Sequence, residues 1–177
     1  MNQEILITSG FPRSGSTYLN QALNILYYPE QEPNWNRHTV GAIKNANRIM
    51  VTFRNPIDAI ASWHNYPSGS QLQSDIKFYI RLYSAVLDKL DKIVLMDFDY
   101  FTKDLNYIKN KVFTNFEIEA VAETTDAKIK EAMLVNGKEI NLPRNNQEEL
   151  EAAKIALVEI PEVQACLDLY AQLKNCA

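Results

Sequence analysis

The chain has 177 residues, of which 46% are hydrophobic, and it carries a formal net charge of −4 at pH 7. This length and apolar content suit one domain spanning 1–177 with a sizeable core. The negative charge argues against a general nucleic-acid binder and against a protein that binds anionic membranes, so we expect neither partner, although a local basic pocket stays compatible with it.

An apolar run, a glycine-bounded loop and a helix start follow one another near the N-terminus. The pattern predicts a strand over 4–9 and a helix over 15–27. The apolar run is too short for a signal peptide or membrane anchor, and we therefore expect a cytoplasmic protein. Between the two elements the spacing is that of a P-loop, with Gly10 and Gly15 at the glycine positions and Thr17 at the hydroxyl position.

This loop departs from the usual P-loop pattern at one position. Ser16 stands where the pattern requires the lysine that reaches the β- and γ-phosphates of a nucleoside triphosphate, and Arg13 supplies a cation inside the loop instead. The backbone features remain, because a glycine-containing turn at a helix N-terminus directs N–H groups at an anion. An ordinary nucleoside triphosphatase is therefore disfavoured, and a turn without a ligand is the structural alternative to a phosphate site.

A second junction of strand and helix follows an irregular segment that extends to about 47. Within that segment we expect a short strand over 39–43. The pattern then predicts a strand over 48–53 and a helix over 56–65. This helix begins at Pro56, which is preorganised for a first helical position.

Two polar residues mark this second junction. Arg54 lies at the C-terminal end of the predicted strand, and Ser62 lies two turns into the helix on the face that carries Asp58. Ligands of open α/β sheets bind at that edge. For Arg54, a surface ion pair with Asp58 is the structural alternative to a ligand contact.

The remaining chain reads as alternating helix and strand and then as mainly helix. We predict a long helix over about 70–91, a strand over 92–97 and a helix over 103–113. The long helix has a core-facing stripe: Leu72, Ile76, Tyr79, Tyr83, Val86 and Leu90. Strands separated by helices imply parallel pairing, so the fold class is α/β, a three-layer P-loop-type fold with a small parallel sheet flanked by helices and a helical C-terminal part.

The only two cysteines, Cys166 and Cys176, lie near the C-terminus at helix-like spacing. Two thiols form neither a disulfide framework nor a four-ligand metal site. We therefore expect unpaired thiols and no metal ion.

Together, the two junctions resemble the cofactor-binding motifs of sulfotransferases that use 3′-phosphoadenosine 5′-phosphosulfate (PAPS). The first motif covers 12–18 and the second covers 54–62. Segments 94–101 and 108–113 resemble the family's next strand, its acidic-aromatic turn and the short helix after it, so the resemblance extends over about 4–116. The Arg-Lys-Gly segment that closes over the cofactor's 3′-phosphate in the cytosolic branch has no clear match here.

The resemblance implies transfer of a sulfuryl group from PAPS to a hydroxyl or amine of a small-molecule, saccharide or peptide acceptor. It implies that Arg13 stabilises the leaving phosphate and that Arg54 and Ser62 bind the 3′-phosphate. Tyr18 matches a position where an aromatic ring often lies against adenine, and a core role for it is equally open. The implied cofactor-binding set is Arg13, Ser14, Gly15, Ser16, Thr17, Tyr18, Arg54 and Ser62.

A general base must also deprotonate the acceptor. His38 follows the first motif in the same order as the catalytic histidine of cytosolic sulfotransferases, and an imidazole with a pKa of about 6.5 suits this role. Other branches of the family use glutamate, and Glu30 and Glu32 lie in the same irregular segment. A solvated loop histidine is the structural alternative for His38.

Two other functions stay open. A P-loop kinase or other nucleotide phosphotransferase needs a Mg²⁺-binding acid after a strand, for which Asp97 and Asp99 are candidates, but Ser16 argues against this class. A non-catalytic relative that binds nucleotide without turnover is compatible with the unmatched C-terminal segment. The short stretch between the two motifs favours an open acceptor site.

Overall fold

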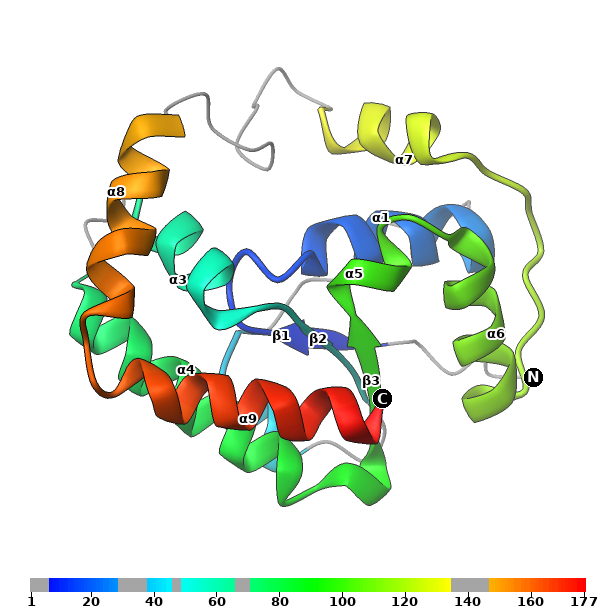
Figure 1. The fold of residues 1–177 in the computed structure, drawn as a ribbon. Helices are drawn as coiled ribbons and strands as arrows, with labels where there is room; N and C mark the ends of the chain where they lie inside the picture. The colour runs from blue at the N-terminus through cyan, green and yellow to red at the C-terminus, as the bar shows by residue number, and fades with distance from the viewer. Residues whose placement is uncertain (1–6, 29–37, 46–48, 66–70, 135–146) are drawn as a thin grey trace.

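A three-stranded parallel sheet lies at the centre of the protein (Figure 1). The computed structural model describes residues 7–28, 38–45, 49–65, 71–134 and 147–177. The strands lie in the order β1-β2-β3 and comprise Thr8–Gly10, Ile49–Phe53 and Ile93–Asp97. Thr8 pairs with Met50, and Ile49 pairs with Ile93. All three strands are buried along their length, as expected for parallel strands covered on both faces.

Helices cover both faces of this sheet (Figure 1). Successive strand residues point to opposite faces, so Met50 packs into one apolar cluster while Val51 packs into the other. The first cluster contains residues of α1 (Ser16–Tyr27), α6 (Leu105–Phe116) and α7 (Asp126–Met133). The second contains residues of α3 (Pro56–His64), α4 (Leu72–Leu87), α8 (Gln147–Val158) and α9 (Val163–Cys176). The predicted fold class is confirmed.

Most predicted element boundaries lie within a few residues of the observed ones. The described part of the predicted strand 4–9 is 7–9, and it overlaps β1, which ends one residue later at Gly10. The predicted helix 70–91 is α4 followed by a 3-10 helix, η1 (Leu90–Lys92), and four positions of its stripe, Ile76, Tyr79, Tyr83 and Val86, are buried. A one-turn helix, α5 (Phe98–Phe101), lies between β3 and α6.

The expected short strand over 39–43 is wrong, because these residues enter a helix, α2 (Val40–Lys44). The Thr39 hydroxyl accepts a hydrogen bond from the Ala42 N–H at 3.1 Å and thereby caps the helix. Ile43 is buried in the cluster that contains α4. The cap and this packing outweigh the strand preference of the β-branched side chains.

The two thiols are free, as expected, with Cys166 buried and Cys176 exposed. Burial raises the pKa of the Cys166 thiol to about 12, so this thiol stays protonated near neutral pH. Among the described residues, we find no helix with the length and apolar character needed to cross a bilayer.

Candidate functional site

The loop between β1 and α1 has the backbone geometry of an anion-binding turn. Arg13 has a φ of 65° and Gly15 has a φ of 87°, so both adopt the left-handed region, with Ser14 between them. For a residue other than glycine this conformation costs about 1–3 kcal/mol and is concentrated at functional sites. Gly15 is the N-cap of α1 and has no side chain to bond the first amides of the helix. A turn of this kind at a helix N-terminus binds anions.

Buried hydrogen bonds hold this loop against β2. The Ser14 hydroxyl lies 2.8 Å from Thr52 Oγ1, and the Ser14 N–H donates to the Phe11 carbonyl at 3.1 Å. The Tyr83 hydroxyl accepts from the Phe11 N–H at 3.2 Å and donates to the Thr52 carbonyl at 2.8 Å. Both the amide and the hydroxyl of Ser14 are thus hydrogen-bonded inside the protein, and Ser14 holds the loop against β2. Phosphate binding by its amide stays a prediction.

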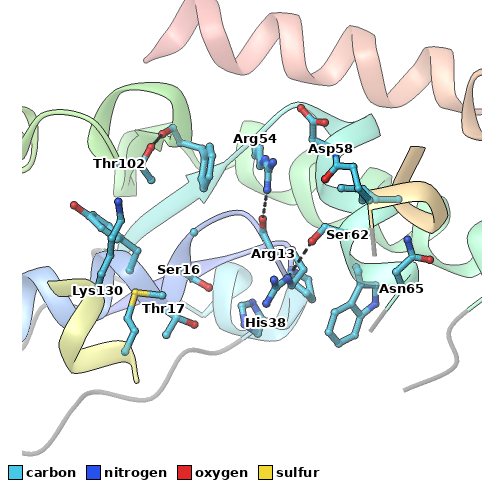
Figure 2. A pocket seen from close by; sticks show the side chains of 18 of the residues that line it. Arg13, Ser16, Thr17, His38, Arg54, Asp58, Ser62, Asn65, Thr102 and Lys130 are labelled. Atoms are coloured by element: carbon cyan, nitrogen blue, oxygen red, sulfur yellow. Dashed lines mark hydrogen bonds between the residues drawn. The ribbon is translucent and has the colours of Figure 1, made fainter. Parts of the chain in front are cut away.

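A cavity of about 780 Å³ opens beside the loop (Figure 2). Its wall combines the loop and the first turn of α1 with residues from α3, α5, α7 and the first turn of α8. Of the predicted site residues, those that line it are Arg13, Gly15, Ser16, Thr17, Tyr18, His38, Arg54 and Ser62. The fold thus brings both sequence motifs and the candidate base to one cavity.

The two motifs contact each other directly through Arg54, Arg13 and Ser62. Arg54 Nη1 donates to the Arg13 carbonyl at 3.3 Å, and Arg13 Nε donates to the Ser62 hydroxyl at 3.1 Å (Figure 2). The Tyr79 hydroxyl donates to the Arg54 carbonyl at 3.0 Å and holds the backbone at the end of β2. Two guanidinium groups and a hydroxyl on one wall form a site suited to charge-assisted hydrogen bonds with phosphate.

Arg54 is held by a ring and a carbonyl. Its guanidinium lies over the Phe98 ring, 4.3 Å from the ring centroid. The carboxylate of Asp58, the alternative partner considered for Arg54, pairs with Lys154 of α8 at 3.0 Å. Burial lowers the pKa of Arg54 from its usual value, and the charges of Asp58 and Asp99 oppose this shift. The guanidinium remains charged at neutral pH and can bind an anion.

His38 borders the same cavity and is fixed by one hydrogen bond. Its Nδ1 lies 2.8 Å from the carbonyl oxygen of Gly10. A carbonyl only accepts, so the proton of a neutral imidazole is on Nδ1 and the lone pair is on Nε2. Burial lowers the pKa of His38 below 6.5, and the bond to Gly10 opposes the shift. This tautomer suits a general base, whereas the alternative bases Glu30 and Glu32 lie outside the described residues.

Tyr18 joins α1 to α7. Its side chain is 6% exposed, its ring lies 6.1 Å from that of Phe101, and its hydroxyl donates to Asp126 at 2.9 Å. Burial, followed by the hydrogen bond to Asp126, raises the pKa of Tyr18, so its hydroxyl stays protonated. Tyr18 is a core residue that also borders the cavity, and a contact with adenine stays a prediction.

The sequence motifs did not reveal part of the cavity wall. Lys130 of α7, which pairs with Asp126 at 2.7 Å, lines the cavity together with Thr102 and Glu149. These residues lie far beyond both motifs in the chain, and no spacing connects them to the loop. The only sequence signal nearby is Thr125, whose hydroxyl caps α7 and marks where the helix begins but not where it packs.

Asp97 and Asp99, the candidate magnesium ligands, are engaged elsewhere. Asp97 is 1% exposed, and its Oδ2 lies 2.5 Å from Lys174 Nζ. Lys174 also lies 3.6 Å from Asp99. Within the described ranges, no group of three or more His, Cys, Asp or Glu side chains is placed to hold a metal ion. The carboxylates that a Mg²⁺-dependent kinase would need are therefore already paired with a lysine.

A solved structure shares this arrangement of helices and strands. The crystal structure of mouse sulfotransferase SULT7A1 complexed with PAP matches with a TM-score of 0.52 and 11% sequence identity, covering 97% of this chain and 89% of that chain. In sequence, no protein-family model and no curated protein matches the chain. At this identity the likeness concerns the fold alone. The chain therefore has a sulfotransferase-like α/β fold.

Proposed function

We propose that the protein is a sulfotransferase that uses PAPS. The supporting observation is the hydrogen-bonded contact of Arg54, Arg13 and Ser62, which joins the guanidinium of Arg54 to the turn before α1. PAPS has a 5′-phosphosulfate and a separate 3′-phosphate, so it can occupy both sites, whereas ATP has no phosphate at the 3′ position. The fold likeness to a sulfotransferase is compatible with this choice.

The cavity residues form two groups, one for the 5′-phosphate of PAPS and one for its 3′-phosphate. The first turn of α1, with the hydroxyls of Ser16 and Thr17, would bind the 5′-phosphate. Arg54 and Ser62 would bind the 3′-phosphate through charge-assisted hydrogen bonds. Arg13 belongs to the turn before α1 and contacts both residues of the 3′-phosphate site, because its carbonyl accepts from Arg54 and its Nε donates to Ser62.

The reaction is an in-line displacement at sulfur. An acceptor oxygen or nitrogen forms a new bond to sulfur, and the bond from sulfur to the bridging oxygen of the 5′-phosphate breaks. The leaving adenosine 3′,5′-bisphosphate keeps the electron pair, and Arg13 stabilises the negative charge that develops on it. His38 Nε2 takes the acceptor proton, and positioning of both substrates supplies the remaining acceleration.

Turnover tests this proposal directly. The protein is incubated with PAPS and a panel of phenols, saccharides, tyrosine-containing peptides and amines, and release of the bisphosphate is measured by chromatography. We expect acceptor-dependent release that Arg13→Ala abolishes and that Arg81→Ala, on the exposed side of α4, leaves unchanged. Tight binding of the bisphosphate with no turnover for any acceptor class would instead favour a non-catalytic nucleotide-binding relative.

A further inference from the structure

The last helix of the described chain contacts the end of β3 through an ion pair whose carboxylate is buried. Lys174 of α9 lies 2.5 Å from Asp97, which is 1% exposed. The Lys174 ammonium also lies 5.0 Å from the ring centroid of Tyr100 and 5.7 Å from that of Tyr170. An unpaired charge at a site as buried as Asp97 is strongly unfavourable, so this lysine determines how Asp97 is held.

Asp97 in turn fixes the start of α5. Its Oδ1 accepts a hydrogen bond from the Asp99 N–H at 3.0 Å and caps the helix that begins at Phe98. The Phe98 ring supports the guanidinium of Arg54 at 4.3 Å. A Cβ added to Gly15 would lie 2.7 Å from Phe98, so α5 is also packed closely against the phosphate-binding turn.

These contacts form a continuous path from α9 to the cavity wall. We propose that Lys174 is a positioning residue for the 3′-phosphate site: through Asp97 it anchors α5, so that Phe98 holds the Arg54 guanidinium where it can bind the 3′-phosphate. This inference rests on the proposed function, because it concerns how strongly the site distinguishes a ligand with a 3′-phosphate from one without it. No part of the two sequence motifs contains Lys174 or Asp97.

Two variants test the path. Lys174→Met keeps most of the side-chain length and removes the charge. The double variant Asp97→Asn/Lys174→Met leaves no unpaired charge at the buried position 97, and the asparagine retains a capping oxygen; Asp99, the second partner of Lys174, is half exposed. Dissociation constants of adenosine 3′,5′-bisphosphate and adenosine 5′-monophosphate are measured by calorimetry on the full chain, because both ligands use the phosphate-binding turn and only the first has the 3′ group.

We expect the preference for the bisphosphate to fall about tenfold in both variants, while affinity for the monophosphate changes less than about twofold. Lys174→Arg should restore the preference. Lys111→Met is the matched control, since Lys111 donates to the Ala177 carbonyl at 2.5 Å and its loss loosens the end of α9 without removing the partner of Asp97. This control should keep the wild-type preference.

An unchanged preference in folded Lys174→Met overturns the inference. If Lys174→Met does not fold, an unchanged preference in the double variant overturns the inference instead. An equal fall in Lys111→Met also overturns it, because general loosening of α9 would then be the cause. A wild-type protein that binds both nucleotides equally overturns the proposed function and this inference with it, whereas a wild-type preference that all variants keep overturns the inference alone.

Discussion

The guanidinium of Arg54 donates a hydrogen bond to the backbone carbonyl of Arg13 at 3.3 Å, so the end of β2 is joined directly to the turn that precedes α1. The Arg13 side chain extends the contact to Ser62. A ligand bound in the turn would therefore have a second cationic group beside it, as the proposed function requires.

Arg54→Ala should weaken binding of adenosine 3′,5′-bisphosphate far more than binding of adenosine 5′-monophosphate. Loss of a hydrogen bond from a charged group costs about 1.5–3 kcal/mol. Calorimetric titration of both nucleotides measures the difference, and Arg81→Ala on the exposed side of α4 serves as the control. Equal weakening of the two ligands would remove Arg54 from the 3′-phosphate site.

His38→Gln should reduce turnover by about 10²–10⁴-fold, because an amide cannot accept the acceptor proton. Affinity for the bisphosphate should change little. Burial lowers the pKa of His38, so the acidic limb of the wild-type rate profile should lie below pH 6.5. A pH-rate profile with an identified acceptor measures both effects, and a variant with the wild-type rate and the same acidic limb would transfer the role to Glu30 or Glu32.

The lowered pKa of His38 also predicts how the free energy of unfolding changes at acidic pH. Its pKa is lower in the folded protein, so the unfolded chain binds more protons between the folded pKa and about 6.5. Wild-type stability should therefore rise with pH through that window, and His38→Gln should reduce the rise. Urea denaturation at a series of pH values measures this rise in stability, and identical pH dependence in both proteins would contradict the lowered pKa of His38.

Gly15→Ala should destabilise the protein and abolish ligand binding. The residue has a φ of 87°, and an added Cβ would lie 2.7 Å from Phe98 and from Phe101. Left-handed strain and overpacking together should cost at least about 2 kcal/mol. Gly41→Ala is the matched control, since Gly41 lies in α2 with only Thr39 Oγ1 near the added atom, at 4.0 Å, and should be neutral or stabilising by about 0.5–1 kcal/mol. Comparable losses in the two variants by chemical denaturation would show that Gly15 is not specially constrained.

Tyr83→Phe should loosen the loop while keeping the core filled. The hydroxyl accepts from the Phe11 N–H and donates to the Thr52 carbonyl, so its removal leaves two buried backbone groups without this partner. Each such loss costs about 1–3 kcal/mol. Denaturation and nucleotide titration measure the effect on folding and on the loop. Tyr170→Phe is the control, because the Tyr170 hydroxyl donates to the exposed Asp99 at 3.3 Å. It should change stability and nucleotide affinity much less, and equal effects of the two variants would contradict the role assigned to Tyr83.

Local patterns in the sequence were sufficient for the parts of the site that lie at strand ends. The glycine spacing located the turn before α1, and Pro56 located the start of α3 with Arg54 just before it, because these signals act on neighbouring residues. Over 39–43 the local signals conflict: the β-branched side chains predict a strand, whereas the hydroxyl of Thr39 caps the helix α2 that forms.

The rest of the site depends on contacts between distant segments. Lys130 reaches the cavity because α7 packs against α1, and Lys174 reaches Asp97 because α9 returns to β3. Neither of these helix contacts produces a residue pattern in or near the two motifs from which it could be predicted. The inward orientation of Ser14 was likewise unpredictable, since it follows from Thr52 of a different strand.

The choice of nucleotide tests the central claim most directly, and it requires no knowledge of the acceptor. The protein is heated with adenosine 3′,5′-bisphosphate and with ATP, each with and without Mg²⁺, and its melting temperature is recorded as a function of ligand concentration. At about a hundred times its dissociation constant a ligand adds about 2.7 kcal/mol of stability, which raises the melting temperature of a domain this size by about 5–10 °C. We predict this rise with the bisphosphate regardless of Mg²⁺ and a much smaller one with ATP. A rise seen only with ATP and Mg²⁺ would contradict the sulfotransferase proposal and favour a kinase.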